Sequence, residues 1–429
     1  MRSRIDRRKF LLSSLALARA ARAQERRLET FLQWKNASSS AREAALPLLI
    51  DRIRAVDANI HAWVQVLPQM PLGSGALSGI PFAVKDVIET KGLATEYGSP
   101  VYKGRVGTTD AAIVRELRTR GGILLGKTHT AAFAYRHPAA TRNPRNLDHT
   151  PGGSSSGSAA AVAAGTVPIA IGTQTGGSVL RPASFCGVTG FKPTHGLIPT
   201  DGVMEYAKSL DTLGFFTHTA ADMIAFWDAF GQPIGRADDV VLGAVDPLPP
   251  VDPEMAGAFS AAVARLRTAG HAVRSLDIAP MLIRLRDAGQ TISAYEGARA
   301  HEARFKQYGD RLDEVASMVR DGLKISDADY SKATRYVAEC RVTMADLYKA
   351  TPVILVPAAP GAAPRGLEST GDARMNYPWT ALGTPAISIP MGLTKGLPLG
   401  LQLTANRGDD ARLLRAAVAA EQSLGFRFE

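Results

Sequence analysis

The chain has 429 residues and a formal net charge of +10, with 45% hydrophobic and 21% charged residues. This composition is typical of a globular protein and excludes a disordered or collagen-like chain. The two cysteines, Cys186 and Cys340, are too few for a disulfide framework or for a zinc site with four ligands. Residues 1–23 hold seven of the 50 basic residues and one of the 40 acidic ones, so the rest has 43 basic residues against 39 acidic ones. That balance gives no strong electrostatic reason for binding to DNA or RNA.

The first 23 residues have the layout of a secretory signal peptide. A basic start precedes a short apolar stretch at 11–18 and a small-residue cleavage motif at 21–23. The sequence RRKFL at 7–11 resembles the twin-arginine export motif. The alternative is an ordinary amphipathic first helix. We expect export to the periplasm, with cleavage after Ala23.

The first half of the remaining chain alternates predicted helices and strands. Residues 28–66 have a mostly helical pattern, and a second helix is expected to start near Pro47, because proline is tolerated in a first helical turn. Two more helices are expected at 111–120, which Gly121 and Gly122 end, and at 158–164. Short apolar runs predict buried strands at 79–85, 123–126 and 167–172.

The second half continues this alternation. Strands are expected at 240–245, 271–278, 353–356 and 386–389, and helices at 252–270, 281–350 and 409–423. Strands that alternate with helices predict an α/β fold, with a central mixed sheet covered by helices on both faces. Because no linker or repeat interrupts the pattern, we expect a single domain at 24–429, with 281–350 as a helical elaboration over the site.

The first motif with chemical potential is GIPFAVKD at 79–86, which places Lys85 at the end of an apolar strand. A lone lysine there most often extends to the surface. Burial instead would lower its pKa and leave a neutral amine that can act as a base.

The second motif is PGGSSSGS at 151–158. Taken alone it is compatible with a flexible linker or a phosphate-binding turn. It is not a Walker motif, because no Gly-Lys-Ser or Gly-Lys-Thr follows. Its position between apolar segments, directly before an alanine-rich helix, argues against a flexible linker.

The third motif is GTQTGGSVLRP at 172–182, in which Gly176 and Gly177 precede Ser178. Glycines allow a sharp turn that leaves backbone N–H groups free, and these groups can form an oxyanion hole around a carbonyl attacked by Ser178. The motif differs from the Gly-x-Ser-x-Gly elbow of α/β-hydrolases. The chain also lacks a Ser-x-x-Lys sequence, which argues against a penicillin-binding protein.

Together these three segments resemble the motifs of the amidase signature family. Ser154 follows Lys85 after 69 residues, and Ser178 follows after another 24. The order, spacing and flanking residues agree with the family, and the resemblance covers residues 27–425. Further segments that are similar to the family are FCGVTGFKPTHGLIPTDGV, SLDTLGFFT, GTPAISIPMGL and GLPLGLQL.

The resemblance implies a Ser–Ser–Lys triad and the amidase signature fold. Ser178 is implied as the nucleophile, Ser154 as the relay of its proton, and Lys85, neutral in the free enzyme, as the final base. A cis peptide bond is implied between Gly153 and Ser154. The groups implied to hold the oxyanion are the backbone N–H groups of Thr175, Gly176, Gly177 and Ser178.

The chain departs from the family pattern near the nucleophile. Many members have an aspartate four residues before it and an arginine two residues after it, where this chain has Gln174 and Leu180. Ala132 stands where many members carry a glutamate. An arginine occurs at Arg181 instead, and GGSVLRP resembles the malonamidase-like branch, which takes small amides bearing a carboxylate. We expect Arg181 either to bind an anionic group of the substrate or to pair with a carboxylate of the protein and support the loop.

The function expected from these motifs is hydrolysis of a linear amide to a carboxylate and ammonia or an amine. One alternative is the glutaminase subunit of a tRNA-dependent amidotransferase, which shares the motifs but works in the cytosol with a partner. Another is a non-catalytic member of the fold that binds an amide-containing ligand, against which the intact Lys–Ser–Ser set argues.

The expected ligand is a small-molecule amide, with no metal and no cofactor. His-Glu-x-x-His is absent, and His129, His137 and His149 are interpreted as loop or site-wall residues. Cys186 is interpreted as an inert core thiol. The uncharged stretch at 150–180 is rich in glycine, serine and threonine, which favours a buried polar site over a membrane helix. We therefore expect no nucleic acid and no stable membrane association, and we leave a homodimer open.

Overall fold

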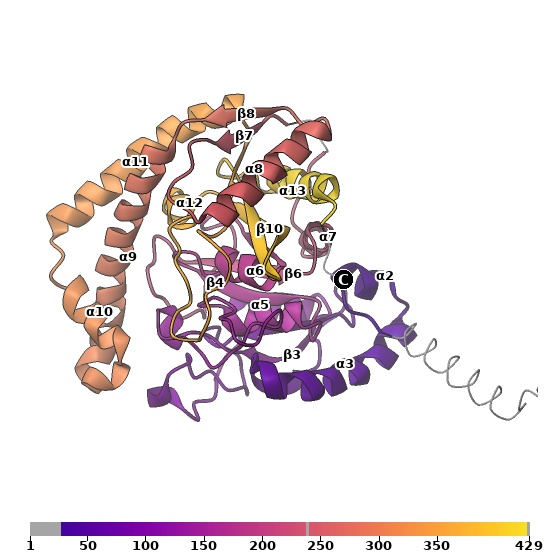
Figure 1. The fold of residues 1–429 in the computed structure, drawn as a ribbon. Helices are drawn as coiled ribbons and strands as arrows, with labels where there is room; N and C mark the ends of the chain where they lie inside the picture. The colour runs from indigo at the N-terminus through magenta and orange to yellow at the C-terminus, as the bar shows by residue number, and fades with distance from the viewer. Residues whose placement is uncertain (1–26, 237–239, 427–429) are drawn as a thin grey trace, which may run out of the picture.

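The computed structural model describes residues 27–236 and 240–426, so the predicted signal peptide at 1–23 lies outside the described residues. Within them, one mixed sheet of 11 strands has the order β1-β3-β2-β4-β6-β5-β10-β11-β9-β7-β8 (Figure 1). The strands are β1 (Trp63–Gln69), β2 (Pro81–Lys85), β3 (Ile123–Thr128), β4 (Ala170–Gln174), β5 (Thr189–Lys192), β6 (Thr212–Thr217), β7 (Leu242–Val245), β8 (Val273–Leu276), β9 (Val353–Pro357), β10 (Ala386–Thr394) and β11 (Leu397–Ala405).

Along the chain, the helices of the described residues lie between these strands, before β1 and after β11. They are α2 (Phe31–Asn36), α3 (Ser39–Ile60), α4 (Ala112–Thr119), α5 (Ser156–Ala163), α6 (Leu180–Cys186), α7 (Ala220–Ala229), α8 (Pro253–Thr268), α9 (Ala279–Tyr308), α10 (Glu314–Gly322), α11 (Asp327–Ala350), α12 (Tyr377–Leu382) and α13 (Asp410–Leu424). Three short 3-10 turns are η1 (Pro100–Tyr102), η2 (Ala132–Ala134) and η3 (Gly309–Leu312).

Strand β5 shows how helices come to cover both faces of the sheet. Successive side chains of a strand point to opposite faces. A side chain at Gly190 would meet Ala183 of α6, whereas the ring of the next residue, Phe191, packs edge-on against Trp227 of α7 with centroids 5.1 Å apart. Helices α6 and α7 therefore lie on opposite faces of β5. The predicted α/β fold with a central mixed sheet covered on both faces is confirmed.

Most predicted elements occur close to their expected positions, but the interpretation of Pro47 is wrong. Helix α3 begins after Ser38, whose side chain accepts a hydrogen bond from the N–H of Ala41, and it continues through Pro47. Pro47 is exposed, so water can solvate the carbonyl that loses its helical partner. The end of the stretch predicted as helical, near Val66, belongs instead to strand β1.

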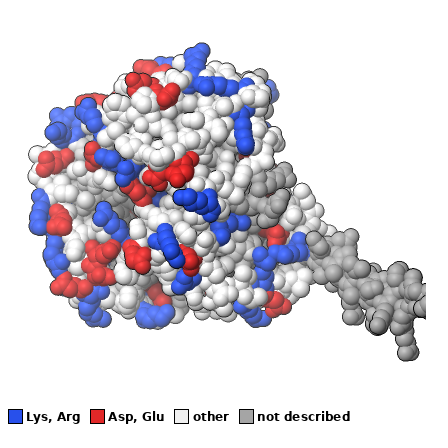
Figure 2. Space-filling model, in the orientation of Figure 1, with Lys and Arg blue, Asp and Glu red and all other residues white. Residues whose placement is uncertain are grey.

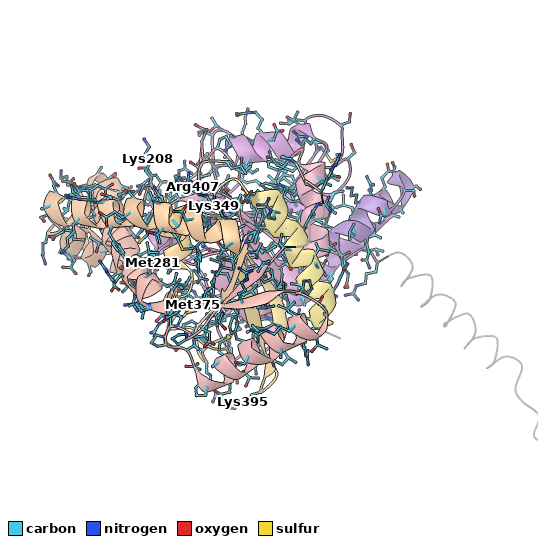
Figure 3. The ribbon with its side chains drawn as sticks, turned by 90° about the horizontal axis from the view of Figure 1, so that it is seen from above. Lys208, Met281, Lys349, Met375, Lys395 and Arg407 are labelled. Carbon is cyan, nitrogen blue, oxygen red and sulfur yellow. The ribbon has the colours of Figure 1, made fainter. Side chains whose placement is uncertain are left out.

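The predicted helical segment 281–350 forms α9, α10 and α11, which pack against one another and extend to one side of the sheet (Figures 1 and 3). The ring of His301 on α9 packs against Phe133 at 5.5 Å, and Tyr308 packs against Tyr102 at 5.7 Å. The segment therefore lies against the loops that follow β2 and β3. Its role as a cover of the site and the single domain at 24–429 stay predictions.

Two surface properties follow from the described residues. Across 27–236 and 240–426, no helix combines the length and the apolar character that crossing a membrane requires. Figure 2 shows basic and acidic side chains interspersed over the visible face, as the nearly balanced charge outside residues 1–23 leads one to expect.

Candidate active site

Lys85 is the last residue of β2 and is fully buried. Its neighbour β4 runs parallel to β2, so both strands end at the same edge of the sheet. The Nζ atom of Lys85 donates hydrogen bonds to Ser154 Oγ and to Thr173 Oγ1, each at 2.8 Å. The amine is thus held between two hydroxyl groups.

Burial lowers the pKa of Lys85 to about 7, and the negative charge of Asp211 opposes that decrease. Within the described part of the chain, Lys85 has no carboxylate within ion-pair distance. A large share of the amine is therefore neutral near pH 7, and a neutral amine can accept a proton from a hydroxyl group.

Ser154 lies in the turn that leads into α5, and its peptide bond with Gly153 is cis. The cis bond is the one that the family resemblance implies. A side chain at Gly153 would come within 2.6 Å of Thr370 Cγ2, so the turn has room only for glycine. The carbonyl of Ser154 accepts a hydrogen bond of 3.0 Å from the N–H of Ala131, which ties the turn to the loop after β3.

Ser178 lies in the loop between β4 and α6, with 8% of its surface exposed. Among the described residues its hydroxyl group makes no hydrogen bond, whereas Lys85 and Ser154 are joined directly. The structure therefore brings two of the three predicted residues into hydrogen-bond contact and leaves the third with a free hydroxyl.

The backbone around Ser178 offers unpaired donors. In the described structure, no acceptor is hydrogen-bonded to the four N–H groups expected to form the oxyanion hole. Two of the residues are closely packed glycines: a side chain at Gly176 would meet the ring of Tyr377 at 2.7 Å and one at Gly177 would meet Asn376 Oδ1, so either substitution would displace a neighbouring side chain. Met375, labelled in Figure 3, precedes these two contacts on the same segment, which therefore covers the nucleophile loop. The four donors are those of Thr175, Gly176, Gly177 and Ser178.

The two departures beside the nucleophile have structural explanations. Gln174 Oε1 accepts hydrogen bonds from the N–H groups of Val179 (2.8 Å) and Leu180 (3.1 Å), and Nε2 donates to Thr380 Oγ1 at 3.0 Å. Gln174 thus supports the start of α6 and ties it to α12. Leu180 and Ala132 are both buried and pack in the core.

Arg181 on α6 is a buried cation, with 6% of its surface exposed. Its Nη2 atom donates to the carbonyl of Gly153 at 2.7 Å and to Thr370 Oγ1 at 3.1 Å, while its buried Nε atom has no partner in the described structure. No carboxylate of the described residues lies within ion-pair distance of it. Burial lowers the pKa of Arg181 to about 10, while Tyr377 and Asp372 raise it, so the group stays charged at neutral pH. Among the described residues, Arg181 therefore does not pair with a carboxylate, which was one of the two expectations from the sequence. It does support the loop, through its hydrogen bond to the carbonyl of Gly153.

The histidines and cysteines do not join this cluster. Burial lowers the pKa of His129 to about 4, and His137 instead lies 3.0 Å from Asp313 at the surface. Cys186 is buried and its pKa is raised to about 12 by that burial, as expected for an inert core thiol. Within the described ranges, no group of three histidine, cysteine or acidic residues could hold a metal ion.

Sequence reasoning missed four residues of this region. Thr173 belongs to the third motif and could have been found from its position on β4. Asp211 lies in SLDTLGFFT, a segment recognised as similar to the family, but no role was predicted for its aspartate. Tyr377 comes from a distant segment with no recognised pattern, and Thr370 is 189 residues from the arginine that it contacts. Only the fold brings these side chains to the site.

Known proteins resemble this chain over nearly its whole length. The amidase family matches residues 44–414. A glutamyl-tRNA(Gln) amidotransferase subunit from Agathobacter rectalis is 31% identical over 96% of this chain and 94% of its own length. A solved amidase structure has a TM-score of 0.82 at 25% identity and covers 92% of this chain and 99% of its own. The solved glutamyl-tRNA(Gln) amidotransferase subunit from Thermotoga maritima has a TM-score of 0.78 at 26% identity, covering 92% and 94%.

Proposed function

Because the chain belongs to the amidase family, whose relatives act on carbon–nitrogen bonds, we propose that it hydrolyses a linear amide through an acyl-enzyme on Ser178. The observation that carries this proposal is the hydrogen bond from the buried amine of Lys85 to Ser154. The loop that follows Thr173, the second partner of Lys85, carries Ser178 with a free hydroxyl and a row of unpaired backbone donors in the described structure. A nucleophile, a base and an oxyanion hole are the parts that acyl transfer requires.

In the proposed reaction a proton is transferred from Ser178 towards Lys85 and then returned to the leaving nitrogen. Ser178 Oγ attacks the amide carbonyl, its proton passes to Ser154, and the proton of Ser154 passes to Lys85. The backbone N–H groups stabilise the oxyanion that forms. As this tetrahedral intermediate collapses, Lys85 returns the proton through Ser154 to the leaving nitrogen. Water then attacks the acyl-enzyme by the same route and releases the carboxylate.

The relatives named as amidotransferase subunits favour a second candidate, the glutaminase subunit of a tRNA-dependent amidotransferase. Both candidates share the chemistry at Ser178; the glutaminase releases ammonia, and the amidase releases ammonia or an amine. They differ in substrate and in dependence on a partner. Ammonia release by the purified chain from glutamine and from a panel of small amides separates them. Turnover of simple amides but not glutamine supports the free-standing amidase, and a preference for glutamine supports the amidotransferase candidate.

We further propose that Arg181 binds an anionic group of the substrate, because it is a buried cation without a carboxylate partner in the described structure. Replacing Arg181 with alanine is expected to raise KM for an amide with a free carboxylate far more than for its neutral analogue. A hydrogen bond to a charged group contributes about 1.5–3 kcal/mol, which corresponds to a loss of roughly ten- to more than a hundredfold. The measurement is kcat/KM for a matched pair of anionic and neutral amides.

The control for Arg181 is Thr370→Val, which removes one of its hydrogen-bond partners and leaves its charge. This variant is expected to change both substrates equally and only slightly. Equal losses on both substrates in Arg181→Ala would mean that the arginine only supports the carbonyl of Gly153, and the carboxylate preference would be wrong.

We also propose that the protein is exported with its first 23 residues removed, because a paired arginine, an apolar stretch and a small-residue motif follow in order. Mass spectrometry of protein from fractionated cells should find a mature chain in the periplasm that begins at Gln24. Replacing Arg7 and Arg8 with lysine should retain an uncleaved chain in the cytosol. An intact N-terminus in the cytosolic fraction of the wild type would contradict export and favour the amidotransferase candidate.

A further inference from the structure

The register of the sheet places Asp211 directly beside the nucleophile loop. Strands β4 and β6 pair in antiparallel fashion, and their last register pair joins Gln174 to Thr212. Continuing that register by one residue sets Thr175 opposite Asp211. Directly opposed residues of an antiparallel pair have neighbouring side chains. Their contact is therefore a consequence of the sheet.

Asp211 uses both carboxylate oxygens. The hydroxyl of Thr175 donates to Oδ1, and Oδ2 accepts from the N–H groups of Tyr206 (2.7 Å) and Ala207 (3.0 Å). Three donors from two separate segments thus converge on one side chain. The position of Thr175, whose own N–H belongs to the expected oxyanion hole, is fixed by this carboxylate.

The same geometry brings Asp211 towards Lys85, because Thr173, which accepts from Lys85, and Thr175, which donates to Asp211, are two residues apart and therefore point to the same side of the sheet. The negative charge of Asp211 raises the pKa of Lys85 against the effect of burial. The other titratable groups that face Asp211 are Glu205 and Tyr206. Burial raises the pKa of Asp211 itself to about 6, so most of its carboxylate is ionised at neutral pH.

We propose that Asp211 is a positioning residue that holds the oxyanion-hole loop through Thr175 and supplies the negative charge that the buried Lys85 faces. The inference rests on the proposed amide hydrolysis. It separates two effects of one carboxylate, a hydrogen bond to the loop and a charge near the base. Each effect predicts a different kinetic change.

The charge is tested with Asp211→Asn. An asparagine can keep all three contacts, because its oxygen accepts from the two N–H groups and its amide donates to the Thr175 hydroxyl. Without the negative charge, Lys85 loses its proton more readily. Because the base must be neutral, kcat/KM is expected to rise with pH as Lys85 loses its proton, and we call this rise the acid limb. In Asp211→Asn the acid limb is expected to move to lower pH by roughly half a unit or more. A limb that stays at the wild-type pH would overturn this part of the proposal.

The hydrogen bond is tested with Thr175→Val, which removes the hydroxyl but keeps the shape of the side chain and the charge of Asp211. We expect kcat to fall roughly tenfold, which is less than the loss on removal of an oxyanion donor itself, with KM nearly unchanged. Thr175→Ser should restore most of the rate. A Thr175→Val enzyme with wild-type kcat would overturn the positioning role. This pair of variants does so even if Asp211→Asn fails to fold.

Asp410 provides a matched control. It is a buried aspartate that also accepts from a threonine, with Thr194 donating through its N–H at 2.8 Å and its hydroxyl at 2.6 Å. It also lies near another buried lysine, Lys192. Asp410→Asn should change thermal stability without moving the acid limb. An equal shift in both variants would attribute the effect to general destabilisation and overturn the proposal. A wild-type enzyme that hydrolyses no amide would instead overturn the proposed function.

Discussion

Replacing Ser178 with alanine is expected to abolish amide hydrolysis while leaving the fold intact. The hydroxyl makes no hydrogen bond in the described structure, so its loss breaks no contact and opens little space. The reaction, however, loses the atom that forms the acyl-enzyme, and such losses reach on the order of 10⁴-fold or more. Initial rates of ammonia release, together with thermal unfolding of both proteins, measure the effect.

Ser184 on α6 is the matched control for this variant. It is a buried serine six residues further along the chain, and its hydroxyl also lacks a partner in the described residues. Ser184→Ala should keep the wild-type rate. A serine-trapping fluorophosphonate should label the wild type and Ser184→Ala but not Ser178→Ala. Wild-type turnover by Ser178→Ala would remove the acyl-enzyme on this residue, and with it the proposed mechanism.

The architecture could be predicted from the sequence where apolar runs are short and clearly bounded. Strand β2 begins after Gly79 and Ile80 and consists of five buried residues, so its pattern was sufficient. Strand β6 is equally buried, but the sequence did not predict it. Gly214 interrupts its apolar run, and glycine within a strand weakens the pattern. Helix α3 contains Pro47, and the sequence pattern predicted a helix start there because proline is usually found in a first helical turn. Pro47 is exposed, so water can solvate the carbonyl that loses its hydrogen bond, and the sequence pattern alone does not show this exposure.

In the candidate site, too, local sequence patterns identified some residues and the fold alone placed others. Lys85, Ser154 and Ser178 lie in local motifs, so the family resemblance identified them together. The partners of these residues come from the fold. Asp211 reaches the site only because β6 pairs with β4, and Thr370 reaches Arg181 across 189 residues. The segment SLDTLGFFT, which contains Asp211, resembles the family, but the strand pairing that gives Asp211 its partners is not encoded in a local pattern. Thr370 has no such local pattern, so there was no basis in the sequence for naming it.

Replacing Lys85 with methionine is expected to lower kcat/KM by about 10²–10⁴-fold, the usual contribution of a general base. Methionine is similar in length but cannot accept a proton. In the wild type the base must be neutral, and burial sets the pKa of Lys85 to about 7. Below that pH the amine is protonated and inactive, so kcat/KM should rise with pH through about 7 and then level off. In Lys85→Met this limb should disappear along with most of the rate.

Lys192 distinguishes this role from the general effect of a buried lysine. It is fully buried on β5, its pKa is also lowered to about 7 by burial, and its Nζ donates only to the carbonyls of Pro193 and Thr384 in the described structure. Lys192→Met should lower the thermal unfolding temperature and leave the pH limb in place. Lys85→Arg adds a second comparison, because a guanidinium stays protonated and should be as inactive as methionine despite its charge. A Lys85→Met enzyme that keeps the wild-type limb would show that another group takes the proton from Ser154.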